Sequence, residues 1–226
     1  MLGQSNMAGY PKAQASDKVK NERIRVLGFD DCAATGRMKD KWDVAVPPLH
    51  ECFAGAIGPG DWFSKTLIDK LPAGDTILLV PCAVSGMSID YFKKGMAPYD
   101  TIIKRAKAAQ QMGGVIEAFL FHQGETDNGN TTWPSKVQTF VNDLRTDLGL
   151  PSVPFFAGEL ARSGKAAGHN TLVNMLPGLI SKSYVISAEG LKLDPGDTTY
   201  MLHFDHDSQV TLGMRYEAKF VEVSGL

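Results

Sequence analysis

Residues 99–160 carry the sequence YDTIIKRAKAAQQMGGVIEAFLFHQGETDNGNTTWPSKVQTFVNDLRTDLGLPSVPFFAGEL. Apolar residues at helical spacing over 99–112 are followed by an apolar run over 116–121, and the same pair recurs over 134–148 and 153–160. Two glycines end the first helical pattern, and a proline opens the second. Helices that alternate with short apolar strands predict a parallel sheet that is covered by helices on both faces.

The same alternation of helical patterns and apolar runs is found along the chain from about residue 58 onward. Residues 11–50 show little periodicity and are expected to be loop-rich, with one strand-like patch at 24–29. We therefore predict a single three-layer α/β domain over residues 1–226, with about five parallel strands. Its remaining elements are a helix capped by Asp61, a strand at 76–81, an irregular helix at 170–180, a strand at 184–187 and a closing helix at 207–221.

The charge balance argues against several classes of partner. The 226 residues include 23 Lys and Arg and 25 Asp and Glu, for a formal net charge of -2, and the basic residues are scattered. Nucleic acids and anionic membranes attract clustered basic residues, so neither is an expected partner, and a weakly charged substrate fits better. No apolar run reaches the roughly 18 residues of a membrane span. We expect a soluble protein, with its oligomeric state open.

The N-terminus leaves the compartment open. No secretory signal pattern precedes Ser5, but a removed leader would be compatible with secretion. Only residues 1–4 come before Ser5, so the first strand is expected to be clipped. Cys32 and Cys52 could pair in an oxidising compartment, although three cysteines form no disulfide framework and free thiols are the expected state.

Ser5 is the first candidate for chemistry. A serine hydroxyl becomes a nucleophile when a histidine, oriented by a carboxylate, takes its proton. Ser5 lies between glycines at positions 3 and 9, which predicts a sharp turn between a strand and a helix. From the residues alone, a serine that caps a helix is the more ordinary interpretation, because the G-x-S-x-G pattern is missing.

Five separate segments resemble one known family, in the order that the family shows. The chain resembles the sialate O-acetylesterase and acetylxylan esterase family, a carbohydrate esterase branch of the SGNH hydrolases. The segments are GQSNMAG at 3–9, WDVAVPPLH at 42–50, AVSGMSIDYFKKG at 83–95, HQGETD at 122–127 and LHFDHDSQVTLGMRY at 202–216.

The resemblance implies a flavodoxin-like α/β/α sandwich and removal of acetyl groups from sugar hydroxyls, without a metal or an organic cofactor. Acetylated xylan or a related glycan is the expected substrate, and an O-acetylated sialic acid is the alternative. The alternative in which the protein is not an enzyme is a catalytically inactive, carbohydrate-binding relative.

The resemblance also assigns roles to residues. Ser5 is implied as the nucleophile and His203 as the general base. The backbone N–H groups of Ser5 and Gly86 and the side-chain amide of Gln123 are implied oxyanion donors. Gly58 and Gly60 also lie near a strand–helix turn, so they compete with Gly86 for this role.

The third member of the triad departs from the family pattern. Family members often carry an aspartate three residues before the histidine, where this chain has Tyr200. Glu125 is our first choice as the carboxylate that orients His203, and Asp197 is the alternative.

Other polar and aromatic residues have simpler interpretations. His122 could replace His203 as the base, but it follows an apolar strand, where a structural role is more usual. Residues 203–207 could form a metal cluster, although their spacing matches no zinc signature and a loop followed by a helix cap at Asp207 suffices. Trp133 and Tyr91 are candidates for stacking on sugar rings.

Overall fold

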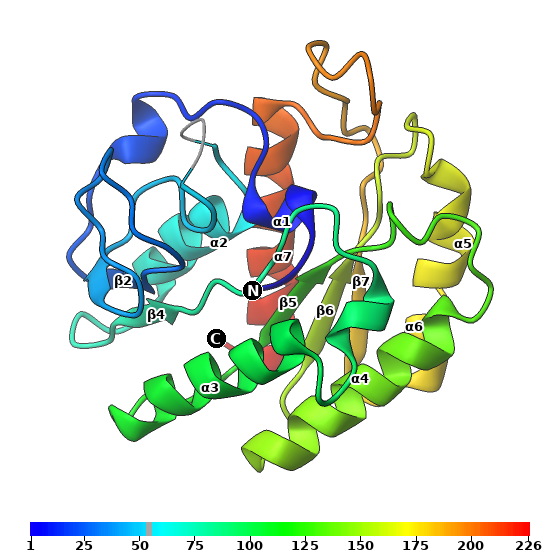
Figure 1. The fold of residues 1–226 in the computed structure, drawn as a ribbon. Coiled ribbons are helices and arrows are strands. Elements are labelled where there is room, and N and C mark those ends of the chain that lie inside the picture. Colours follow the sequence, from blue (N-terminus) through cyan, green and yellow to red (C-terminus); the bar gives the residue numbers. More distant parts are fainter. Residues whose placement is uncertain (53–55) are drawn as a thin grey trace.

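The computed structural model describes residues 1–52 and 56–226, and a parallel sheet lies at its centre (Figure 1). The strands are β1 (Leu2–Gly3), β2 (Ile24–Leu27), β3 (Trp42–Val44), β4 (Ile77–Leu79), β5 (Phe119–His122), β6 (Phe155–Gly158) and β7 (Ser183–Ile186). The α-helices are α1 (Ser5–Ala8), α2 (Pro59–Leu67), α3 (Ala97–Gln111), α4 (Trp133–Leu148), α5 (Asn170–Val173), α6 (Leu176–Leu179) and α7 (His206–Ser224). Short 3-10 helices are η1 (Ser16–Lys18), η2 (Ile68–Lys70), η3 (Ile89–Phe92) and η4 (Ala167–His169).

Two sheets are joined by a backbone ladder. The central sheet has the order β1-β5-β6-β7 with all pairs parallel, and the second has the order β3-β2-β4, in which β3 is antiparallel to β2. Residues 80–84 continue from β4 alongside β1. Met1 N donates to Val80 O at 3.0 Å, Cys82 N to Met1 O at 2.9 Å and Val84 N to Gly3 O at 3.0 Å. The α/β class is confirmed, with four parallel strands in the central sheet rather than about five.

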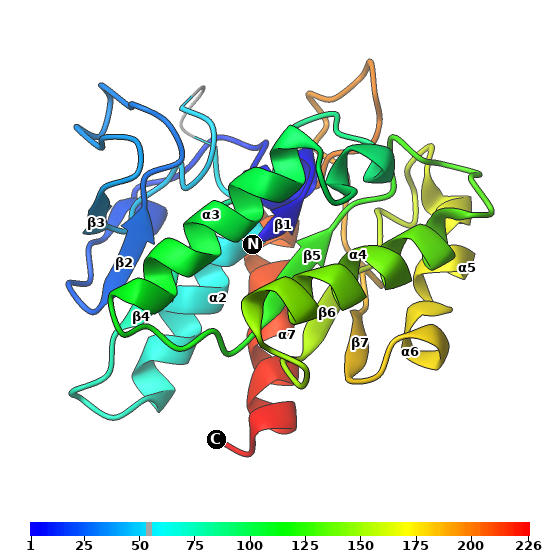
Figure 2. The ribbon, with the colours of Figure 1, turned by 60° about the horizontal axis from the view of Figure 1, so that its bottom comes forward.

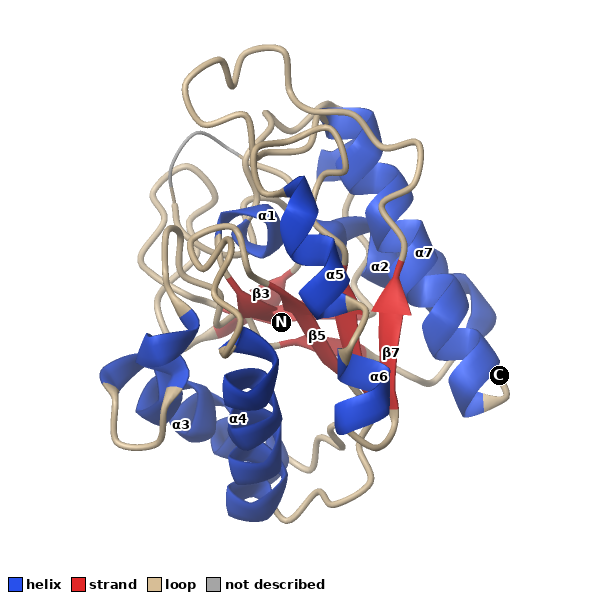
Figure 3. Cartoon of the chain, turned by 90° about the vertical axis from the view of Figure 1, so that its right-hand side faces the viewer, coloured by secondary structure: helices blue, strands red, loops and turns tan. Residues whose placement is uncertain are grey.

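Alternate residues of the central strands face two separate helical layers. Phe119 and Phe121 belong to the apolar cluster that includes residues of α3 and α4, whereas Leu120 belongs to the cluster that includes residues of α2 and α7. Successive side chains of a strand point to opposite faces, so this split produces the three layers. Figure 2 shows α3 and α4 over one face, and Figure 3 shows the strands between that layer and the α2/α7 layer. Within residues 1–52 and 56–226, no helix is both long enough and apolar enough to cross a membrane.

Most predicted elements are found within a few residues of their expected bounds, but the start of α2 differs. Gly58 is its N-cap and Pro59 its first residue, so Asp61 is not the cap. The Asp61 carboxylate instead accepts a hydrogen bond from Gly58 N at 3.1 Å, as the third residue of a capping box does.

The loop-rich N-terminal third is held by a disulfide. Cys32 and Cys52 are bonded, with a Cα–Cα distance of 5.2 Å, so the expectation of free thiols is wrong for this pair. Their pairing depends on how the loops bring two distant segments together, which the spacing in the sequence does not reveal. Cys82 is buried and free in the described part of the chain.

Arg105 of α3 fastens the same region to the sheet. Its buried guanidinium donates to three backbone carbonyls, namely Leu27 O at 2.8 Å, Gly28 O at 2.9 Å and Pro81 O at 3.1 Å. It also donates to the carboxylate of Asp40 at 2.6 Å. A buried guanidinium needs all these acceptors, because each unpaired N–H would cost free energy.

We predict that Arg105→Ala lowers the free energy of unfolding by about 3–5 kcal/mol, since it leaves buried acceptors unpaired. Lys104→Ala is the matched control, because Lys104 lies 3.4 Å from the same Asp40 carboxylate but its side chain is 74% exposed. The control should change the free energy by no more than about 0.5 kcal/mol. Urea unfolding measures both, and equal losses would contradict the role of Arg105.

Candidate active site

Ser5 lies at the carboxyl edge of the central sheet, where β1 docks against β5. Gln4 N donates to His122 O at 2.9 Å, and α1 begins at the next residue. Gly3 has a φ of +127°, and a Cβ at this position would lie 1.9 Å from His122 O. Only glycine fits this close approach of two backbones. The glycine of the GQSNMAG segment thus serves the turn that presents Ser5.

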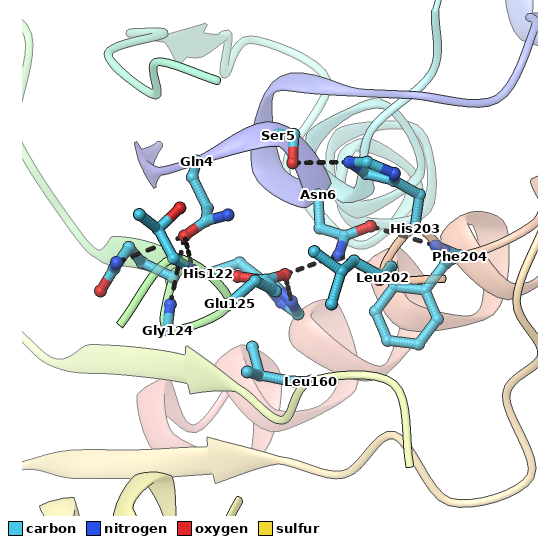
Figure 4. A network of polar contacts seen from close by, with 12 residues as sticks. Gln4, Ser5, Asn6, His122, Gly124, Glu125, Leu160, Leu202, His203 and Phe204 are labelled. Carbon is cyan, nitrogen blue, oxygen red and sulfur yellow. Dashed lines mark hydrogen bonds and ion pairs between the residues drawn. The ribbon is translucent and has the colours of Figure 1, made fainter. Parts of the chain in front are cut away.

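His203 reaches Ser5 from the other end of the chain. Its Nε2 lies 2.8 Å from Ser5 Oγ, and the two residues are 198 positions apart in the sequence. Figure 4 shows the imidazole pointing at the hydroxyl. Both residues are largely buried, with exposed fractions of 9% for Ser5 and 7% for His203. This is the contact that a serine–histidine nucleophile requires.

Asp197 occupies the other side of the imidazole. Its Oδ2 lies 2.8 Å from His203 Nδ1. The same carboxylate accepts backbone N–H groups from Tyr200 at 3.0 Å, Leu202 at 2.9 Å and His203 at 3.0 Å, so the loop curls around its own aspartate. Burial acts to raise the pKa of Asp197, but these hydrogen bonds outweigh it and lower the pKa to about 2. An anion therefore orients the imidazole at neutral pH.

Glu125, our first choice for this position, does not contact His203, and this choice is corrected to Asp197. The Glu125 carboxylate accepts a hydrogen bond from Asn6 Nδ2 at 2.6 Å and lies 3.4 Å from His122 Nε2. Burial favours its protonated form, but His122 and Asn6 together hold its pKa below the usual range. His122 itself is buried beside Glu125 and makes no hydrogen bond to Ser5, as a structural histidine would be.

The candidate oxyanion donors Ser5 and Gly86 differ in the surroundings of their backbone N–H groups. Ser5 N is the first N–H of α1, so it has no acceptor inside the helix. Gly86 has a φ of +71° and open space around it. Its neighbour Ser85 is held by Glu51, whose carboxylate accepts from Ser85 Oγ at 2.6 Å. The role of these two N–H groups stays a prediction.

Gly58 and Gly60 have packing roles. A Cβ on Gly58 would lie 2.6 Å from Met7 O, and one on Gly60 would lie 2.2 Å from the Met1 sulfur. Both glycines therefore allow α2 to approach the N-terminal segment closely.

Gln123 is buried, and its amide is engaged within the protein. Its oxygen accepts from Trp133 Nε1 at 2.6 Å, while its Nε2 donates to Met87 O at 3.2 Å and to Asp127. The role of Gln123 in an oxyanion hole stays a prediction. The sugar-stacking hypothesis for Trp133 is wrong, because its side chain is completely buried. Tyr91 lies on η3 with 49% of its surface exposed, and its role in stacking on sugar rings stays a prediction.

Tyr10 is a site residue that the sequence did not reveal. Its ring stacks on the His203 imidazole, with centroids 3.7 Å apart and planes 5° apart. Tyr200 lies edge-on to the same imidazole at 6.1 Å and is 59% exposed. An aromatic residue directly after the GQSNMAG segment was the only available signal, and its contact with the other end of the chain depends on the fold.

The residues around His203 hold the start of α7. Asp205, rather than Asp207, is the N-cap, and its carboxylate accepts from Ser208 N at 2.8 Å. His206 bonds Asp17 at 2.8 Å and Asp207 at 2.9 Å. Over the described ranges 1–52 and 56–226, no group of three or more His, Cys, Asp or Glu is arranged to hold a metal ion.

Comparisons with known proteins agree on one family. The profile of the family described as "Carbohydrate esterase, sialic acid-specific acetylesterase" matches residues 1–222. A probable carbohydrate esterase from Arabidopsis thaliana is 30% identical over 239 residues, which cover 95% of this chain and 86% of that protein.

Solved structures share the fold. The X-ray structure of the Arabidopsis thaliana protein has a TM-score of 0.82 at 28% identity, covering 98% of this chain and 95% of that chain. The crystal structure of NanS has a TM-score of 0.80 at 14% identity, with 98% and 95% covered. A carbohydrate acetylesterase from Xanthomonas citri has a TM-score of 0.68 at 17% identity, and the match spans 98% of this chain but 55% of that one.

The low pKa of Asp197 predicts a pH dependence of stability. The folded pKa of about 2 lies below the ordinary value of 3.8, so this carboxylate stabilises the fold above about pH 4 and loses that contribution as the pH falls toward 2. Wild-type protein should therefore lose more unfolding free energy between about pH 4 and 2 than Asp197→Asn does. Urea unfolding over this range measures the difference, and parallel curves would contradict the assignment.

Proposed function

The chain belongs to the carbohydrate esterase family of sialic acid-specific acetylesterases, and on this premise we propose that it removes O-acetyl groups from a carbohydrate by serine catalysis. The observation that carries the proposal is the chain of contacts from Ser5 Oγ to His203 Nε2 and from His203 Nδ1 to Asp197, each 2.8 Å long. These are the three groups and the two contacts that an activated serine needs.

The first half of the reaction transfers the acetyl group to Ser5. His203 Nε2 takes the hydroxyl proton while Ser5 Oγ attacks the acetyl carbonyl carbon, and the carbonyl oxygen becomes an oxyanion. Asp197 stabilises the imidazolium and keeps Nε2 directed at the serine. The tetrahedral intermediate then collapses, the bond to the sugar oxygen breaks, and His203 returns its proton to that oxygen.

The second half releases acetate. A water molecule loses a proton to His203 Nε2 and attacks the acetyl carbon. Collapse of the intermediate then breaks the bond between that carbon and Ser5 Oγ, and His203 returns the proton to Oγ. In both halves the oxyanion needs fixed donors, for which we propose Ser5 N–H and Gly86 N–H. One such donor is worth about 10²–10³ in rate.

We propose an acetylated neutral glycan, such as xylan, as the substrate. The charged neighbours of the site support this choice. Burial raises the pKa of Tyr10, and the nearby carboxylates of Asp197 and Asp194 raise this pKa further. Among the described residues, no lysine or arginine side chain bonds to Ser5, Tyr10 or His203. An acidic setting of this kind disfavours an anionic sugar. An O-acetylated sialic acid is the second candidate, which the family description favours.

We predict that Ser5→Ala lowers kcat on 4-nitrophenyl acetate by at least about 10³, because no other hydroxyl in the described part of the chain is bonded to His203. Asp197→Asn should lower kcat by about 10²–10⁴ through loss of the anionic orienter. Ser135→Ala, on an exposed part of α4, is the control and should keep full turnover. Unchanged turnover in Ser5→Ala would contradict the role of Ser5, whereas no turnover in wild-type protein would favour a catalytically inactive carbohydrate-binding protein.

The substrate class has its own test. Acetate release should be faster from acetylated xylan oligosaccharides than from an O-acetylated sialic acid, when kcat/KM is compared at one pH and ionic strength. The reverse order would move the assignment to the anionic sugar and would leave the serine mechanism untouched.

A further inference from the structure

We propose that the buried Asn6–Glu125 pair is a positioning device, which sets the place of the His203 imidazole relative to Ser5. The proposal rests on the proposed function, since it concerns how the same serine and histidine are held. Neither Asn6 nor Glu125 bonds to Ser5 Oγ or to the imidazole, so both act through the backbone that carries His203 (Figure 4).

The Asn6 amide bridges both neighbours of His203. Asn6 follows Ser5 in the chain and is completely buried. Its Nδ2 donates to Leu202 O at 3.0 Å, and its Oδ1 accepts from Phe204 N at 3.1 Å. One planar side chain thus holds the backbone on each side of the histidine. The positions of Ser5 and of the His203 imidazole are therefore both set by the same short helix, α1.

Glu125 determines which way round the Asn6 amide lies. Its Oε1 accepts from Asn6 Nδ2 at 2.6 Å, which leaves Oδ1 to face Phe204 N. A flipped amide would place Oδ1 against both the carboxylate and the Leu202 carbonyl, and Nδ2 against another N–H donor. Oδ1 also accepts from Gln209 Nε2 at 3.3 Å, so four repulsive contacts would replace four hydrogen bonds, and the strongest of them, with an ionised Glu125, excludes the flipped state.

The burial of the Glu125 carboxylate costs free energy, which calls for an explanation. Its side chain is 1% exposed, and burying a carboxylate is unfavourable unless its hydrogen bonds compensate. His122 and Asn6 hold its pKa below the usual range despite this burial, which keeps the acceptor charged. The cost is explained if the carboxylate serves to fix Asn6.

Exchange of the two functional groups tests the device. Asn6→Asp places a second carboxylate against Glu125 and the Leu202 carbonyl, and we expect kcat to fall about 10²-fold with KM changed less than about threefold, as a misplaced base would produce. The double variant Asn6→Asp/Glu125→Gln restores one donor between the two side chains, with its direction reversed. It should recover at least about tenfold in kcat over Asn6→Asp.

Glu125 provides a second and milder comparison. Glu125→Gln keeps an acceptor oxygen for Asn6 and should stay within about fivefold of wild-type kcat, whereas Glu125→Leu removes the acceptor and should lose about 10²-fold. If Asn6→Asp does not fold, this pair decides the question. A crystal structure of Glu125→Leu should show His203 Nε2 beyond hydrogen-bond distance of Ser5 Oγ, and an unchanged contact would overturn the proposal.

The control is an Asn–Glu pair outside the site. The exposed Asn174 donates from Nδ2 to the buried Glu159 Oε1 at 2.8 Å. Asn174→Asp also places a second carboxylate against a buried glutamate and should lower the unfolding midpoint, yet change kcat less than about twofold per folded molecule. Unaltered kcat in Asn6→Asp and Glu125→Leu, with active wild-type protein, would refute the positioning role. Inactive wild-type protein would refute the proposed function instead.

Discussion

The hydrogen bond between Ser5 Oγ and His203 Nε2 is the interaction on which the rest of this site depends. It joins two residues from opposite ends of the chain at a distance of 2.8 Å. Two local features make it possible. Gly3 lets β1 lie against β5, which fixes Ser5, and the loop before α7 curls around Asp197, which fixes His203. Stacking by Tyr10 covers one face of the imidazole that these features bring into place.

The energetics of the site follow from the burial of charge. Asp197 and Glu125 are both buried carboxylates: Asp197 accepts from three backbone N–H groups, whereas Glu125 accepts from Asn6 Nδ2 and lies beside His122. The two carboxylates differ in the origin of their donors. The N–H groups that donate to Asp197 belong to the backbone of the loop that carries His203, whereas the amide that donates to Glu125 is the side chain of Asn6. One carboxylate therefore orients the imidazole directly, and the other reaches it only through the backbone on either side.

Much of the fold could be predicted because its signals are local. The period of apolar residues places α3, β5, α4 and β6 close to their predicted bounds, since each element buries one face against a neighbour. β1 and β3 have two and three residues, too few to show a period, and their pairing depends on contacts with distant strands. The pairing of these two strands could therefore not be predicted from the sequence.

The site was predictable in part. Ser5 and His203 were identified by resemblance, and the structure brings them together. The choice between Glu125 and Asp197 could not be made, because it depends on how residues 197–203 curl. Trp133 illustrates the same limit: a tryptophan in a polar segment looked available to sugar, yet Gln123 holds it in the core.

The most direct test is to trap the acetyl group during turnover. Rapid acid quenching with an acetylated xylan oligosaccharide, followed by peptide mass spectrometry, should find acetate esterified to Ser5, and no such adduct in His203→Ala. Acetate released at the full rate with Ser5 never acetylated would contradict the account.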